Sequence, residues 1–116
     1  MTPYERSSRV EYVLARLKER SFRDIVTPSP VEMTAVGRLH TADFLEFMRS
    51  ASADWKTAGF ACHASETAMT NGTWAAALSS AASAQSAQRH VAAGARAAFA
   101  LCRPPGHHAS SDQYGG

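Results

Sequence analysis

The sequence predicts an α/β fold in which helices pack on a short parallel sheet. Residues 74–91 form a long Ala- and Ser-rich stretch, typical of a helix that lies close to a sheet. Residues 97–102 form a continuous apolar run, the pattern of a parallel strand covered on both faces. A loop with two prolines and a glycine follows at 103–106. A helix, a buried strand and a glycine loop in this order are typical of α/β architecture.

Length and charge restrict the function classes. The 116 residues are enough for one domain, 1–116, and the net charge of +2 gives no reason to expect nucleic acid as a partner. No apolar run is long enough to span a membrane, so we expect no membrane partner. We expect Cys62 and Cys102 to be reduced, buried thiols in a cytoplasmic protein.

The sequence of the first half of the chain predicts two helices and a short strand. Thr2–Glu5 is a capping-box pattern that opens an amphipathic helix over about residues 3–20. Residues 24–26 are a strand candidate that Pro28 closes. Ser29–Glu32 repeats the capping-box pattern and predicts a short helix that ends near Leu39.

The second half predicts two further helices and their ends. Thr41 is an N-cap candidate for a helix that runs towards Trp55 and Gly59. The dipeptide Asn71-Gly72 indicates a turn before the helix 74–91, and Gly94 is placed to end that helix. We expect the large aromatic side chains to anchor the core, notably Phe44, Trp74 and Phe99.

The loop after the predicted strand holds the candidate functional residues. Pro104 and Pro105 lack backbone donors, so the strand must stop near Cys102. Gly106 permits backbone angles that other residues avoid, and this freedom can direct His107 and His108 into a cleft. Two adjacent imidazoles can divide proton transfer, one accepting a proton from water and the other donating one.

The loop resembles the signature of the zinc-dependent deacetylases, the histone deacetylase and acetylpolyamine amidohydrolase family. Arg103–Ala109 is similar to its His-His motif, and Gly115-Gly116 to the glycine pair that follows. The similarity extends over nearly the whole chain, and includes the segments Arg6–Leu17, Leu39–Leu45, Glu66–Ala68, Gly72–Ser80 and Ala97–Cys102. The segments at 66–68, 72–80 and 97–102 look most like the acetylpolyamine amidohydrolase branch. The resemblance covers about the first third of a family catalytic domain.

The resemblance implies a partial three-layer arginase/deacetylase-like fold and the hydrolysis of an N-acetyl amide. His107 and His108 would be the catalytic pair that transfers protons, on a loop shaped by Arg103, Pro104, Pro105, Gly106, Gly115 and Gly116. The complete family domain binds zinc through later Asp and His residues, which have no counterpart here. We therefore expect this chain to hold no metal and to be inactive alone, as the N-terminal fragment of a deacetylase of the acetylpolyamine or acetyl-lysine type.

The sequence departs from the family at two places. Thr2–Glu5 lacks the histidine that usually starts the corresponding segment. In the polyamine branch a long loop with acidic residues precedes the segment that matches Cys62–Glu66, whereas here residues 59–61 pass almost directly into it. A cationic substrate is attracted by carboxylates near the pocket mouth, so polyamine recognition is left open.

The sequence leaves several alternatives open. The chain can be a self-associating structural or binding module, or a subunit complemented by a second polypeptide that carries the metal site. A sheet edge without a neighbour recruits other chains, so we also expect a homo-oligomer that buries the strand 97–102 or the helix 74–91. A replacement metal site is conceivable on ligand type alone, from Cys102, His107, His108 and Asp112. His40 and His63 are expected to be structural or solvent-exposed.

Overall fold

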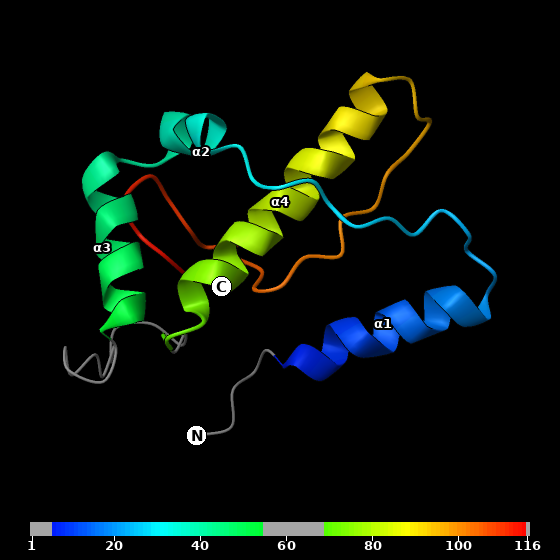
Figure 1. Ribbon diagram of the computed structural model, residues 1–116, viewed down its shortest axis with the longest axis horizontal. Coiled ribbons are helices and arrows are strands. Elements are labelled where there is room, and N and C mark those ends of the chain that lie inside the picture. Colours follow the sequence, from blue (N-terminus) through cyan, green and yellow to red (C-terminus); the bar gives the residue numbers. More distant parts are fainter. Residues whose placement is uncertain (1–5, 55–68, 116) are drawn as a thin grey trace.

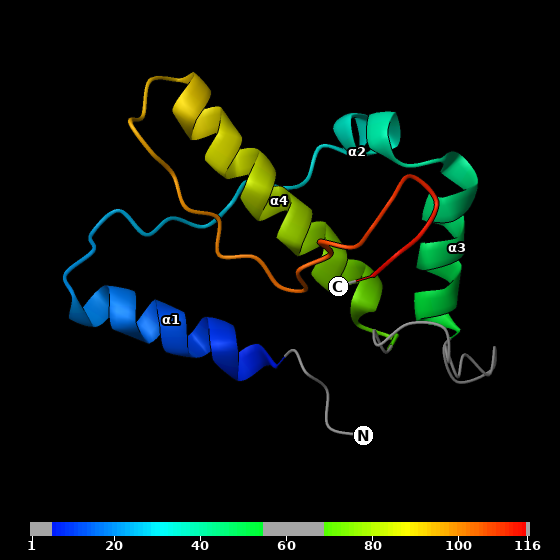
Figure 2. The same cartoon turned by 180° about the vertical axis from the view of Figure 1, so that it is seen from behind.

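Helices are the only regular elements in residues 6–54 and 69–115, the part of the chain that this computed structural model describes (Figure 1). In chain order they are α1 (Ser7–Glu19), α2 (Met33–Leu39), α3 (Ala42–Ala53) and α4 (Thr73–Ala92). The long helix α4 occupies the middle of the molecule, and α1 lies apart from α2 and α3 (Figures 1 and 2). The last described residues return between α3 and α4.

The predicted amphipathic pattern is confirmed in α1. Its half-buried residues are those predicted from the helical spacing, Val10, Val13, Leu14 and Leu17. The other residues of α1 are exposed, and Arg16 pairs with Glu19 at 2.6 Å on that exposed side. Helix α1 begins at Ser7 with Arg6 as its N-cap, and the capping-box pattern at Thr2–Glu5 lies outside the described residues.

The second capping-box prediction is wrong. Helix α2 begins at Met33, and its N-cap Glu32 makes no side-chain cap hydrogen bond. The preceding backbone is instead held by α4. The amide of Ser29 donates to the hydroxyl of Ser86 at 3.0 Å, and the amide of Glu32 donates to Oε1 of Gln85 at 2.7 Å. Tertiary hydrogen bonds to α4 have taken the place of the local cap.

The predicted start of α3 and the predicted limits of α4 are confirmed, whereas α3 ends at Ala53, before Trp55. The hydroxyl of Thr41 accepts from the amide of Phe44 at 3.2 Å, which caps α3. Asn71-Gly72 forms a turn before α4. Gly94 has a φ of +109° and its amide donates to the carbonyl of Val91 at 3.0 Å, which ends α4 at a position that favours glycine.

The core is small and lies where α3 packs against α4. Met48 and Ala51 of α3 are buried with Met69, and the aromatic rings of Phe44, Trp74 and Tyr114 pack against them. Ser52, only 1% exposed, joins the two helices. Its hydroxyl donates to the carbonyl of Thr70 at 2.9 Å and accepts from the amide of Trp74 at 2.9 Å. This hydroxyl therefore satisfies an amide of the first turn of α4, which has no partner within its own helix.

The α/β prediction is wrong for the described residues. Neither predicted strand, at 24–26 or at 97–102, forms, so there is no parallel sheet and no three-layer arrangement. Ala97 and Ala98 are exposed, and Phe99 is 74% exposed, which also makes its expected role as a core anchor wrong. Phe44 and Trp74 do pack on the core, as predicted.

The error has a clear physical cause. An apolar run indicates that its side chains prefer burial. A strand also needs a neighbouring strand, which pairs with its amides and carbonyls. Within the described residues no such neighbour lies beside 97–102. The end of this segment is instead hydrogen-bonded to a helix, since Arg9 of α1 donates to the carbonyl of Cys102 at 2.8 Å.

The molecule is more extended than a closed domain of its length. The Cα radius of gyration is 15.6 Å, against about 13 Å for a compact domain of this size. Large apolar side chains stand in solvent, among them Tyr12, Phe22, Val26, Leu39 and Phe99. No helix in the described residues has the length and apolar character needed to cross a membrane. The described chain therefore leaves much apolar surface uncovered.

We predict that Ser52→Ala lowers the free energy of unfolding by about 1–3 kcal/mol, because it leaves the half-buried amide of Trp74 without its partner. The carbonyl of Thr70 keeps a hydrogen bond from the amide of Thr73 at 3.1 Å. Urea denaturation followed by circular dichroism measures this change. Ser50→Ala is the matched control, since that hydroxyl bonds only within α3, to Glu46. It should change the same quantity by less than about 0.5 kcal/mol. Equal effects of the two substitutions would contradict the role given to Ser52.

Candidate active-site loop

The two histidines lie side by side at the tip of a loop. The ring centroids of His107 and His108 are 4.1 Å apart, with an angle of 47° between the ring planes. Both side chains are exposed. Gly106 has a φ of +80°, and its carbonyl accepts from the amide of Ala109 at 3.0 Å, so a tight turn holds the pair. The sequence prediction that Gly106 shapes this loop is consistent with its positive φ.

Gly115 packs directly against His108. The amide of His108 donates to the carbonyl of Gly115 at 3.2 Å. A Cβ built on Gly115 would lie 3.2 Å from the Cβ of His108, so any larger residue would push the two segments apart. Glycine is needed here for close approach. Gly116 lies outside the described residues.

The base of the loop is anchored to three helices. Ser80 of α4 donates from its hydroxyl to the carbonyl of Pro104 at 2.8 Å, and Arg9 of α1 donates to the preceding carbonyl of Cys102. The amide of Thr41, at the start of α3, donates to the carbonyl of Ser111 at 2.9 Å. Neither Ser80 nor Arg9 was singled out from the sequence. A hydroxyl in the middle of an Ala-rich helix was the available signal for Ser80.

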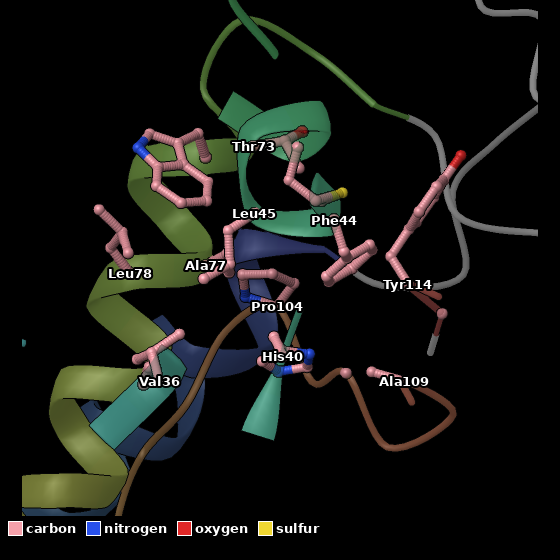
Figure 3. A pocket seen from close by; sticks show the side chains of 15 residues that line it. Val36, His40, Phe44, Leu45, Thr73, Ala77, Leu78, Pro104, Ala109 and Tyr114 are labelled. Carbon is pink, nitrogen blue, oxygen red and sulfur yellow. The ribbon is translucent and has the colours of Figure 1, made fainter. Parts of the chain in front are cut away.

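A cavity of about 170 Å³ lies beneath the loop (Figure 3). Its walls are apolar side chains of α2, α3 and α4, together with loop residues Pro104, Gly106, Ala109, Tyr114 and Gly115. His107 and His108 are not part of this lining. The loop thus faces the cavity with residues such as Pro104, Ala109 and Tyr114, while the two imidazoles are exposed to solvent.

His40 is a structural residue of the cavity wall. Its ring lies 5.3 Å from the ring of Phe44, centroid to centroid, and it is half-buried. Its Nδ1 is buried, and no hydrogen-bond partner for it is found among the described residues. The sequence expectation of a structural His40 is in keeping with this position, while His63 lies outside the described residues.

The described residues do not assemble a metal site. No group of three or more His, Cys, Asp or Glu side chains close enough to hold an ion occurs among them. The replacement site considered from the sequence is not formed. Cys102 directs its thiol to the carbonyl of Ser80 at 3.4 Å, and Asp112 accepts from the hydroxyl of Ser110 at 3.1 Å.

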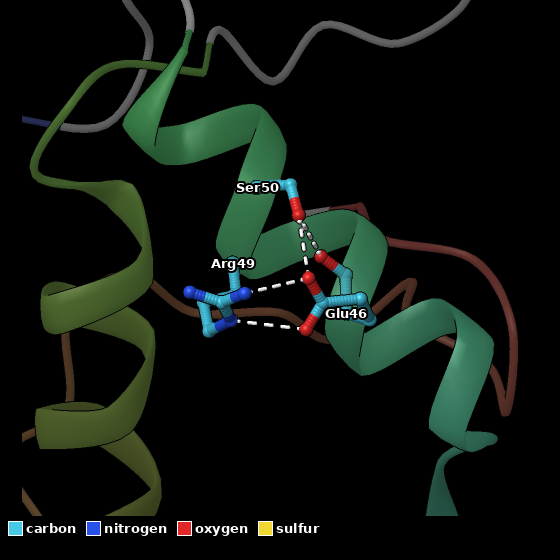
Figure 4. A network of polar contacts seen from close by, with 3 residues as sticks. All are labelled: Glu46, Arg49 and Ser50. Atoms are coloured by element: carbon cyan, nitrogen blue, oxygen red, sulfur yellow. Dashed lines mark hydrogen bonds and ion pairs between the residues drawn. The ribbon is translucent and has the colours of Figure 1, made fainter.

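A separate polar network lies on the surface of α3 (Figure 4). Arg49 donates to both carboxylate oxygens of Glu46, at 2.6 and 3.0 Å, and the hydroxyl of Ser50 donates to the same carboxylate at 2.9 Å. The hydrogen bond from Arg49, followed by that from Ser50, lowers the pKa of Glu46. These exposed groups bond within one helix, so we assign the network to the helix surface.

Comparison with known proteins identifies the family. The model of the histone deacetylase domain matches residues 3–116. The chain belongs to the histone deacetylase family. The resemblance drawn from Arg103–Ala109 is thereby confirmed, and His107 and His108 lie within the matched region.

The similar proteins are acetylpolyamine amidohydrolases. That of Mycoplana ramosa is 39% identical over 142 positions, which include 98% of this chain and 42% of the relative. Acetylpolyamine amidohydrolase 1 of Pseudomonas aeruginosa is 35% identical, over 97% of this chain and 41% of its own length. The Burkholderia pseudomallei enzyme is 61% identical over a shorter stretch of 44 residues. The chain thus spans about two fifths of the length of the first two relatives.

We predict that Gly115→Ala displaces His108 and lowers the free energy of unfolding by about 1 kcal/mol, the lower end of the cost of overpacking. The measurements are urea denaturation and the NMR resonances of the His108 ring. Gly37→Ala is the control, because a Cβ there meets nothing within 4 Å. It should stabilise α2 by about 0.5–1 kcal/mol. An unchanged His108 resonance in Gly115→Ala would contradict the close contact.

Proposed function

We propose that this chain supplies the proton-transfer histidines of a deacetylase that hydrolyses N-acetyl amides, of the acetylpolyamine or acetyl-lysine type. The observation that carries the proposal is the pair of adjacent, exposed imidazoles of His107 and His108 within a region that matches the family. One imidazole would accept a proton from the attacking water. Its neighbour would donate a proton to the leaving amine, and the products would be acetate and an amine.

The described residues do not fit a zinc ion by themselves, so no step through zinc is derived from them. In our proposal the metal is held by polypeptide that corresponds to the remaining length of the relatives, either a second chain or a further segment. The chain alone would then be inactive and would hold no stoichiometric zinc. This proposal also takes the protein to be cytoplasmic, in keeping with the free thiol of Cys102.

The substrate class rests on the relatives and on one difference from them. Their names favour an acetylpolyamine. However, the alignment with the Mycoplana ramosa enzyme extends over 142 positions, more than the 116 residues of this chain, so the relative carries residues that this chain lacks. If these include acidic residues near the pocket mouth, a cationic polyamine loses attraction. Both substrate types therefore belong in the test.

We predict that co-expression with the remaining part of the Mycoplana ramosa enzyme yields a zinc-containing complex that releases acetate. An acetylated polyamine and an acetyl-lysine peptide are the two substrates to assay. His107→Ala and His108→Ala should each lower kcat by about 10²–10⁴-fold, the usual contribution of a general acid or base. His90→Ala, an exposed histidine near the end of α4, is the control and should leave kcat unchanged.

The same experiment can contradict the proposal in two ways. A complex whose kcat does not depend on His107 or His108 would remove their proposed role. Failure of the two polypeptides to associate would remove the complementing partner and favour the self-associating module. Elemental analysis of the isolated chain is the third check, and one tightly held zinc per chain would contradict the proposed division of the site.

A second candidate function is that of a self-associating module, favoured by the exposed apolar side chains. We predict that the isolated chain forms a homo-oligomer through the surface around Phe99, which is 74% exposed. Light scattering at micromolar concentration should report more than one chain per particle. Phe99→Ser should shift the population to monomers, whereas Tyr12→Ser, on α1, should not. A folded monomer whose melting temperature is independent of concentration would contradict this prediction.

A further inference from the structure

Ser80 of α4 makes two contacts with the segment that leads into the histidine loop. Its hydroxyl donates to the carbonyl of Pro104 at 2.8 Å, and its backbone carbonyl accepts from the thiol of Cys102 at 3.4 Å. Ser80, Cys102 and Pro104 are all half-buried. One residue of the helix therefore holds the chain at two points, both at the base of the histidine loop.

The hydroxyl of Ser80 bonds outside its helix, as do those of Ser52 and Ser86, whereas the hydroxyls of Ser83 and Ser50 bond to their own helices. Ser83 donates to the carbonyl of Ser79 at 3.1 Å, and Ser50 donates to the carbonyl of Glu46 at 2.8 Å. Such bonds to the preceding turn are the common fate of a serine inside a helix. The hydroxyl of Ser80 instead donates its hydrogen bond to a carbonyl outside the helix, 24 residues later in the chain. This contact is tertiary.

The loop has a particular need for an outside donor. Pro104 and Pro105 have no backbone N–H, so this part of the chain cannot be held through its own amides. Its carbonyls are the backbone groups that remain for anchoring. The structure supplies donors to two of them, Arg9 to Cys102 and Ser80 to Pro104, each at 2.8 Å. These two hydrogen bonds fix the backbone at the base of the histidine loop.

We propose that Ser80 is a positioning residue for His107 and His108. Its hydroxyl fixes the carbonyl of Pro104, which lies three residues before His107. From that point the turn at Gly106 leads to the pair, and Gly115 bounds it on the far side. The part of this inference that concerns turnover rests on the proposed deacetylase function. The part that concerns the arrangement of the two rings does not.

The test compares three substitutions in α4 by NMR of the histidine rings in the isolated chain. Ser80→Ala removes the hydroxyl without weakening the helix, because alanine is the better helix former. It should shift the ¹⁵N and ¹H ring resonances of His107 and His108. Ser80→Thr retains a hydroxyl and should restore the wild-type positions. Ser83→Ala, whose hydroxyl bonds only within α4, should leave both rings unchanged.

Two results would overturn the inference. One is unchanged ring resonances in Ser80→Ala while circular dichroism shows that the protein is folded. The other is a Ser80→Thr protein that matches Ser80→Ala although α4 remains helical. If Ser80→Ala unfolds the chain, Ser80→Thr alone decides, since wild-type ring resonances in it support the inference and shifted ones oppose it.

The complemented enzyme separates this inference from the proposed function. There Ser80→Ala should lower kcat about threefold to tenfold, the range expected for one neutral hydrogen bond, and leave KM unchanged. Ring shifts in the isolated chain without any activity in the complex would oppose the deacetylase proposal and leave the positioning role intact. Full activity of Ser80→Ala, with unchanged rings, would oppose the positioning role and leave the deacetylase proposal intact.

Discussion

The buried hydroxyl of Ser52 is the interaction on which the rest of the structure depends. It accepts from the amide of Trp74 and donates to the carbonyl of Thr70, so the end of α3 is joined to the start of α4. Few large side chains are buried around it, and the core of Met48, Ala51 and Met69 is small. Because so little apolar surface is buried, the two hydrogen bonds of Ser52 contribute strongly to fixing the angle between the two helices.

Helix α4, once placed, serves as the platform for the remaining segments. Its alanines leave room for other backbone to lie close, and its few polar side chains provide specific attachment. Gln85 and Ser86 hold the segment before α2, and Ser80 holds the base of the histidine loop. The position of His107 and His108 thus follows from contacts of one helix with segments far apart in the sequence. The tip of the loop is then set by Gly106 and Gly115.

Local signals in the sequence predict the helices, whereas contacts between residues far apart in the sequence could not be predicted. The cap at Thr41, the stop at Gly94 and the apolar spacing of α1 each depend on residues within one or two turns. The histidine pair was found because its loop motif is local as well. The strand predicted at 97–102 depends on a neighbouring strand, which no local pattern reveals. The role of Ser80 was missed for the same reason, since its partner lies 24 residues away.

The folded chain itself holds the histidine loop in place, through its contacts with α1, α3 and α4. Hydrogen exchange of individual amides tests this most directly, because it compares bonded and solvated amides in the same molecule. The amides of Trp74 and His108 donate hydrogen bonds, whereas that of Phe99 has no such bond among the described residues. We expect the first two to exchange at least about tenfold more slowly than their intrinsic rates, and Phe99 to exchange near its own. Exchange of the His108 amide as fast as that of Phe99, each relative to its intrinsic rate, would show that the loop is not held in place.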